Sequence, residues 1–143
     1  MAFTGNWTCN TFKTGLMNGA FNFTSGTYKI ALYTNAATLD ATTTAYTSTG
    51  EVVASGYTAG GLTLTIAQVP TIGTQTGAAT SYISFSNAVW TGSITARGAL
   101  IYLSGSGNPA VCVLDFGNDK TSNTTFTVQF PAVTNTSAII RIS

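Results

Sequence analysis

The residues of this chain that could take part in chemistry are few and widely spaced. The 143-residue sequence contains no histidine, two cysteines and four carboxylate side chains, which are Asp40, Glu51, Asp115 and Asp119. Without histidine, the Ser-His-Asp and Cys-His arrangements of nucleophilic hydrolases are excluded, and most zinc sites lose their usual ligands. A glycosidase needs two carboxylates that face one cleft, and the spacing of these four does not indicate such a pair. We therefore predict a protein that is not an enzyme and that holds no cofactor and no metal ion.

Two further patterns could bind a ligand but have simpler interpretations. Asp115, Asn118 and Asp119 could offer oxygens to calcium, yet their spacing does not follow an EF-hand loop, and an exposed polar turn explains them. The GYTAGG segment at 56–61 precedes an expected strand and lacks the lysine of a phosphate-binding loop.

The two cysteines, Cys9 and Cys112, lie far apart in the sequence. No feature of the chain marks an oxidising compartment, so a disulfide between them is the less favoured alternative. Cys112 is expected to be a small buried apolar residue.

The centre of the predicted fold is a β-hairpin. Apolar runs at 98–103 and 109–116 flank a Ser-, Gly- and Asn-rich break at 104–108, a pattern typical of two antiparallel strands and their turn. A direct register across this break places Leu100 opposite Cys112. Neither face of the pair is polar, so we expect the hairpin to lie centrally and to be covered on both sides.

The same register places Arg97 opposite Asp115, which predicts a cross-strand ion pair. The alternative is that Arg97 reaches a neighbouring subunit. Tyr57 and Trp90 lie beside loop residues, where they could anchor an interface, stack on a sugar or close one end of the core. The candidate interface residues are therefore Tyr57, Trp90 and Arg97.

The remaining chain alternates short strands with polar breaks. Phe12, Leu16 and Met17 have helical spacing within 9–20, with Asn10 or Thr11 as the possible N-cap. Asp40 is expected to cap a short helical turn in the long connection 35–61. Further strands are expected at 27–34, buried on one face, and at 62–68, 80–86, 89–90, 125–130 and 138–142, with turns or loops at 70–77 and 117–123. This pattern predicts one domain over residues 1–143, an all-β antiparallel sandwich of Ig-like or jelly-roll type with one short N-terminal helix.

The composition is unusually poor in charge. Only 6% of the residues are charged and the net charge is +1, against about 25% charged residues in ordinary domains. Such a chain lacks the basic field for nucleic acid and the basic cluster for a membrane surface, so neither partner is expected. Low charge also protects poorly against self-association, which indicates a surface covered by other subunits of a homo-oligomer; an ordinary neutral β domain explains the composition equally well. The N-terminus shows no signal-peptide pattern.

Six phrases of the sequence stand out together and in one order. They are YKIALYT at 28–34, the segment 40–46, GYTAGG at 56–61, VW at 89–90, ITARGALIY at 94–102 and AVCVLDFGNDK at 110–120. In this order they resemble a family of small virion structural proteins of tailed bacteriophages. The resemblance covers roughly residues 12–142, and GLMNG at 15–19 departs from it by placing glycines where a better helix former is expected.

The resemblance implies a virion component that is assembled in the cytoplasm of a bacterial host, and it supplies no catalytic motif. The leading hypothesis is a capsid decoration (cement) protein, a homo-oligomer and most readily a trimer, that stabilises the lattice of the major capsid protein. A tail, collar or fibre component is the second hypothesis. The third is a carbohydrate-binding β-sandwich that uses Trp90, Tyr57 or Tyr46.

Overall fold

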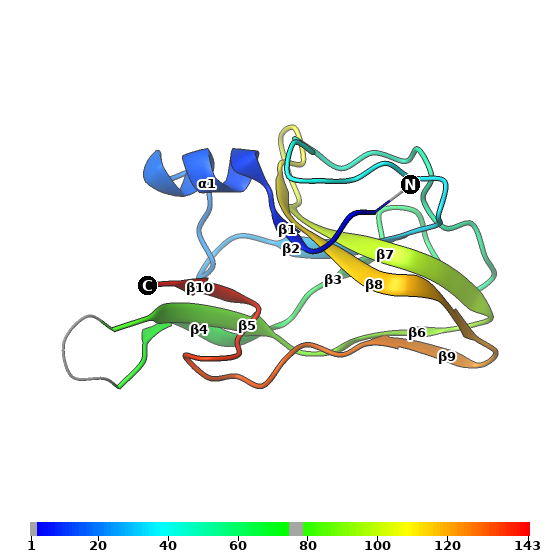
Figure 1. The fold of residues 1–143 in the computed structure, drawn as a ribbon. Coiled ribbons are helices and arrows are strands. Elements are labelled where there is room, and N and C mark those ends of the chain that lie inside the picture. Colours follow the sequence, from blue (N-terminus) through cyan, green and yellow to red (C-terminus); the bar gives the residue numbers. More distant parts are fainter. Residues whose placement is uncertain (1–2, 75–78) are drawn as a thin grey trace.

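The computed structural model describes residues 3–74 and 79–143 and consists mostly of antiparallel β-strands (Figure 1). The expectation of an all-β protein with antiparallel sheets and one short N-terminal helix is confirmed, and no helix in the described ranges is long and apolar enough to cross a membrane. The elements are β1 (Trp7–Thr8), α1 (Asn10–Met17), β2 (Tyr28–Tyr33), β3 (Leu62–Thr63), β4 (Ile66–Ile72), β5 (Ser81–Phe85), β6 (Ala88–Thr91), β7 (Ile94–Leu103), β8 (Ala110–Ser122), β9 (Thr125–Val128) and β10 (Ile140–Ile142).

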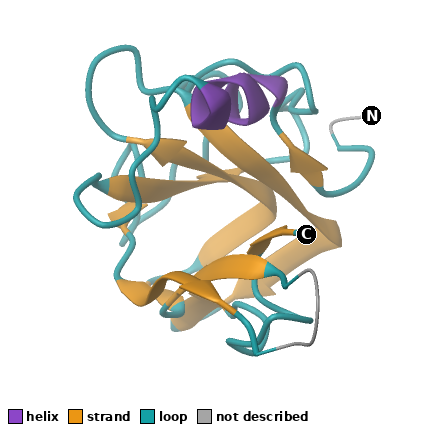
Figure 2. Cartoon of the chain, turned by 90° about the vertical axis from the view of Figure 1, so that its left-hand side faces the viewer, coloured by secondary structure: helices purple, strands orange, loops and turns teal. Residues whose placement is uncertain are grey.

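The strands form one large sheet and two small ones. The large sheet has the order β1-β8-β7-β2-β3, and the small sheets have the orders β10-β5-β4 and β6-β9. Figure 1 shows the small sheets end to end below the large sheet, and Figure 2 shows the space between these layers from the side where the chain ends. The predicted central hairpin, β7 and β8, occupies the middle of the large sheet, and both of its faces are buried at 98–102 of β7 and 110–113 of β8, whereas the second half of β8 is largely exposed.

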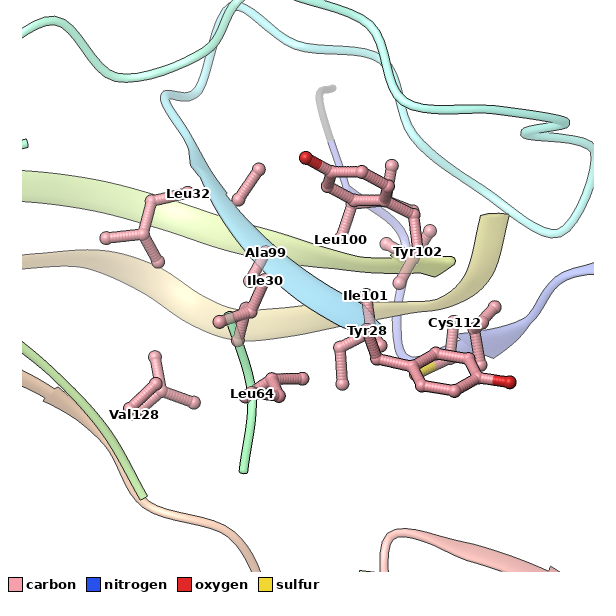
Figure 3. Packing of buried hydrophobic residues seen from close by; sticks show 14 of the residues in the cluster. Tyr28, Ile30, Leu32, Leu64, Ala99, Leu100, Ile101, Tyr102, Cys112 and Val128 are labelled. Atoms are coloured by element: carbon pink, nitrogen blue, oxygen red, sulfur yellow. The ribbon is translucent and has the colours of Figure 1, made fainter. Parts of the chain in front are cut away.

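The core lies between the layers and continues on the other side of the large sheet. Figure 3 shows Ile30 and Leu32 directed toward Leu64, in the link between β3 and β4, and toward Val128 of the opposite layer, whereas Tyr102 projects from the far face of β7. Strand β2 is therefore buried on both faces, with only Lys29 partly exposed. The expectation of a strand buried on one face is wrong, because period-2 alternation does not reveal what covers the second face.

That cover is the long connection 34–61. It runs from the edge of β2 to the start of β8 and back. The amide of Tyr46 donates to the Asn108 carbonyl at 2.9 Å, and the amide of Val52 donates to the Leu32 carbonyl at 2.9 Å. The segment therefore crosses the outer face of the large sheet, as the cyan trace in Figure 1 shows.

The register of the central hairpin differs by one residue from the prediction. Next to the turn, the amide of Leu103 donates to the Pro109 carbonyl at 2.9 Å. A bulge then shifts the pairing, so that Leu100 lies opposite Val113 and not opposite Cys112. The prediction is wrong at this point because β8 takes up one extra residue, which exchanges the faces of the β8 residues that pair with 98–101. A second irregularity shifts the pairing again between Ala96 and Gly98.

Other strand boundaries also differ from the predicted ones, and in each case tertiary structure gives the reason. The expected polar loop 117–123 is largely the end of β8, because the first half of β7 is long enough to pair with it. The expected strand 62–68 is divided into β3 and β4, because the chain leaves the large sheet for the small one. Pro70 lies within β4, which occupies the start of the expected turn 70–77, and residues 75–78 lie outside the described part of the chain.

The N-terminal helix is shorter than the predicted 9–20. Its N-cap is Cys9, which makes no side-chain cap hydrogen bond, so the expected caps Asn10 and Thr11 are wrong. Phe12 is buried as predicted, but Met17 is 91% exposed, because the helix ends there and turns away at Asn18. Asp40 caps a tight turn rather than a helix, through its bonds from the amide and hydroxyl of Thr42 at 2.7 and 2.6 Å.

Candidate functional site

Glu51 is a buried charged residue at the edge of β2, where it forms a bridge with Tyr33. Its side chain is 8% exposed and accepts hydrogen bonds from three donors. The hydroxyl of Tyr57 and the amide of Gly60 donate to Oε1, each at 2.7 Å, and the hydroxyl of Tyr46 donates to Oε2 at 2.6 Å. A buried carboxylate is tolerable only with such compensation.

A second set of contacts ties these donors to the large sheet. The Tyr57 hydroxyl accepts the amide of Leu32 in β2 at 2.9 Å, and the Tyr102 hydroxyl of β7 donates to the Gly60 carbonyl at 2.7 Å. The ring of Tyr46 stacks on that of Tyr102 with centroids 4.9 Å apart. We call Glu51, Tyr46, Tyr57, Gly60 and Tyr102 the Glu51 cluster; it joins the connection 34–61 to the outer face of the sheet.

The phenols of the cluster remain proton donors. Burial, reinforced by the hydrogen bond to Glu51, raises the pKa of Tyr46 to about 12. The same two causes raise the pKa of Tyr57 further, and burial followed by the charge of Glu51 raises the pKa of Tyr102. These hydrogen bonds between neutral phenols and a carboxylate have a structural role, because none of the phenols is poised to lose a proton near neutrality.

Sequence reasoning missed the cluster. The available signal was a single carboxylate in the long uncharged stretch 41–61, between Tyr46 and Tyr57. The separation of these residues along the chain follows no periodic pattern, so only the folded connection brings them together.

The predicted ion pair between Arg97 and Asp115 is present. The side chains of the two residues are 13% and 12% exposed, so the pair is largely shielded from water. The Arg97 guanidinium also lies over the ring of Phe3, 5.5 Å from its centroid, and Asp115 Oδ1 accepts the amide of Gly117 at 2.8 Å. The contacts of Arg97 thus hold the N-terminal segment against the outer face of the sheet, and a neighbouring subunit is not needed to explain them.

The structure brings Tyr57 and Trp90 together inside the protein. Their ring centroids lie 6.2 Å apart, and Trp90 is only 2% exposed. Of the three alternatives for Trp90, the one that closes the core is therefore confirmed, and an exposed anchor or sugar platform is contradicted, because the loop that carries Tyr57 and the ring of Phe126 cover Trp90. Tyr57 is half-buried and its hydroxyl is engaged with Glu51, so all three candidate interface residues make internal contacts in the fold.

The four carboxylates are engaged in different ways. Glu51 lies in its cluster, Asp115 pairs with Arg97, and Asp119 is exposed on β8. Hydrogen bonds from Thr42 lower the pKa of Asp40. Within residues 3–74 and 79–143, no group of three or more His, Cys, Asp or Glu side chains could hold a metal ion.

Cys9 and Cys112 are both free and buried. Burial raises the pKa of the Cys9 thiol to about 11 and raises that of Cys112 as well. Buried thiols of high pKa are poor nucleophiles, so the structure gives these residues a packing role.

The surface has hollows rather than a deep cavity. One groove of about 440 Å³ lies between the end of β8 and β9 and is lined by a mixture of apolar and hydroxyl-bearing side chains. Two adjoining hollows of about 480 and 370 Å³ lie between α1 and β10 and share Phe12, Leu16, Ile140 and Ile142 in their linings; the larger is of mixed character and the smaller is mainly apolar. Comparison of the chain with protein-family models, curated proteins and solved structures found no match.

Proposed function

We propose that this chain is a structural protein of a tailed-bacteriophage virion, and most specifically a capsid decoration protein that stabilises the major capsid lattice. The proposal rests first on the phrases in 12–142 that resemble such proteins. The observation that carries it furthest is the distribution of charge. Glu51, Arg97 and Asp115 are engaged in internal contacts, which leaves the rest of the surface with only four Lys or Arg and two Asp residues out of 143.

A surface of this kind suits permanent contact with other subunits. Uncharged contacts depend little on ionic strength, and many identical weak contacts on a symmetric shell add up through avidity. We infer a symmetric homo-oligomer, a trimer, as the assembled unit. The finer architecture that we propose is an Ig-like or jelly-roll sandwich, in which the two small sheets act together as the second layer.

Co-sedimentation with purified shells that lack this protein tests the function. We expect saturable binding, with a copy number fixed by the symmetry of the shell and with the bound protein visible as repeated density by electron microscopy. A few copies at a single vertex would assign the chain to the tail, collar or fibre instead. No binding to shells, together with binding of the isolated protein to glycans, would overturn the structural role.

A further inference from the structure

The groove between α1 and β10 is an open side of the molecule. We call it the α1–β10 groove; its walls are Phe12, Lys13 and Leu16 from the helix and Ile140, Arg141 and Ile142 from the strand. It continues past Leu16 toward Phe21 and Ile83, which line the adjoining hollow. Ile142 is 55% exposed although it lies in a strand, so the apolar floor of the groove is incompletely covered.

The backbone beside the groove is also incomplete. Within the described ranges, β10 pairs only with β5 and β1 pairs only with β8. Thr8 of β1 and Ile139 to Ser143 line the same hollow from its two sides. The free edges of the two layers therefore face a common space, and an unpaired edge is a template for an added strand.

The charge of the groove is one-sided. Lys13 and Arg141 stand at its rim, and no Asp or Glu is found among the described residues that line it. Lys13 Nζ donates to the Asn10 side chain at 3.5 Å, and Arg141 Nη1 donates to the Thr136 carbonyl at 2.5 Å. Both cations keep further donors for a carboxylate. The chain is otherwise almost uncharged, so two unpaired cations beside one apolar floor indicate an acidic and apolar occupant.

A second copy of this chain does not supply such an occupant. Glu51, Asp115 and Asp40 are held by internal hydrogen bonds. Asp119 is exposed but lies within GNDKT, which has no apolar side chain to fill the floor.

We propose that the α1–β10 groove binds an extended segment of a different protein, one that combines apolar side chains with at least one carboxylate. The segment adds as a strand to the free edge of β10, its apolar side chains cover Leu16, Ile140 and Ile142, and its carboxylate meets Lys13 and Arg141. This inference goes beyond the proposed function, because it describes the ligand of one groove whichever particle or cell component supplies it.

A displayed library of random peptides tests the proposal with the whole purified chain as bait. We expect the enriched peptides to alternate apolar residues with Asp or Glu. Synthetic copies of them should bind about tenfold more weakly to Lys13→Glu and Arg141→Glu, and more weakly in high salt. Ile142→Ser should also weaken binding, through the floor rather than the rim. The matched control is Lys120→Glu, which makes the same charge change on β8, outside the groove.

The variants alter exposed side chains, so circular dichroism and the melting temperature should match those of the wild type. Enrichment of neutral or basic peptides, equal binding to the groove variants and to Lys120→Glu, or no enrichment at all would overturn the proposal. So would self-association of the wild type that Ile142→Ser abolishes, because a second copy would then be the occupant. None of these results depends on whether the chain binds capsid shells.

Discussion

At the level of single residues, Glu51 stabilises the fold through hydrogen bonds rather than through an opposite charge. Its three donors belong to the connection 34–61 itself, and the described residues give it no salt-bridge partner. Removing the carboxylate would strand two hydroxyls and one amide in a site with little access to water.

We therefore expect Glu51→Ala to lower the free energy of unfolding by about 3–5 kcal/mol. Glu51→Gln keeps the shape and can still pair with all three groups, so its cost should be about 1–2 kcal/mol. Urea unfolding followed by tyrosine fluorescence measures both. Equal and negligible effects of the two substitutions would show that Glu51 does not hold the connection.

Arg97 presents a different case, because it is paired, stacked on an aromatic ring and largely shielded. Arg97→Ala should lower the free energy of unfolding by about 1–3 kcal/mol, since it removes the charge-assisted bond to Asp115 and the contact with Phe3. Arg141→Ala, at an exposed arginine, should cost less than about 0.5 kcal/mol. Capsid binding should survive Arg97→Ala; its loss at unchanged stability would support the alternative that Arg97 contacts a neighbouring subunit.

At the level of elements, glycines allow the backbone of the connection 34–61 to lie in direct contact with the backbone of the large sheet. Gly61 has a φ of +74°, and a Cβ atom there would overlap the carbonyl oxygen of Ile30 in β2. Gly19, after α1, has a nearly identical φ of +76° but nothing within 4 Å of the same position. A substitution at Gly19 therefore introduces backbone strain alone, whereas the same substitution at Gly61 introduces backbone strain together with a steric overlap.

We expect Gly19→Ala to cost about 1–2 kcal/mol, the price of a left-handed conformation. Gly61→Ala should cost several kcal/mol more, because the carbonyl of a central strand must move. Chemical denaturation of the two variants side by side gives the difference. If both cost the same, the close approach of the connection to β2 is not maintained in solution.

At the level of the whole molecule, buried tyrosines make stability sensitive to alkali. Burial raises the pKa of Tyr28 and of Tyr46 from 10.0 to about 12, and raises those of Tyr33 and Tyr57 further. Above pH 10 the folded state then holds protons that the unfolded chain releases. Unfolding therefore becomes more favourable as the pH rises.

The expected result is stability that is steady below about pH 10 and falls progressively toward pH 12 and beyond. Urea midpoints across this range measure the fall, and phenolate absorbance should rise largely together with unfolding. Ready ionisation of all tyrosines in a protein that stays folded would contradict the buried positions of these rings.

The sequence alone was sufficient for the class of the fold and for its central pair of strands. Apolar runs around a glycine-rich break predict the β7–β8 hairpin, and the alternation in 125–130 correctly places Phe126, Val128 and Phe130 inside. Arg97 and Asp115 were also identified as partners. The hairpin and the strand depend on residues close in sequence, where local preference and burial agree. The ion pair forms although Asp115 lies opposite Gly98, because the side chain of the neighbouring Arg97 reaches it.

Tertiary structure alone decided the bulge in β8, the burial of β2 on both faces and the Glu51 cluster. It also placed Trp90 inside the core and left the α1–β10 groove open. Each of these depends on where a long connection or a sheet edge comes to lie, and contacts between segments tens of residues apart leave no periodic trace in the sequence. Strand alternation specifies that a residue can face a core, but only the folded chain determines what covers it.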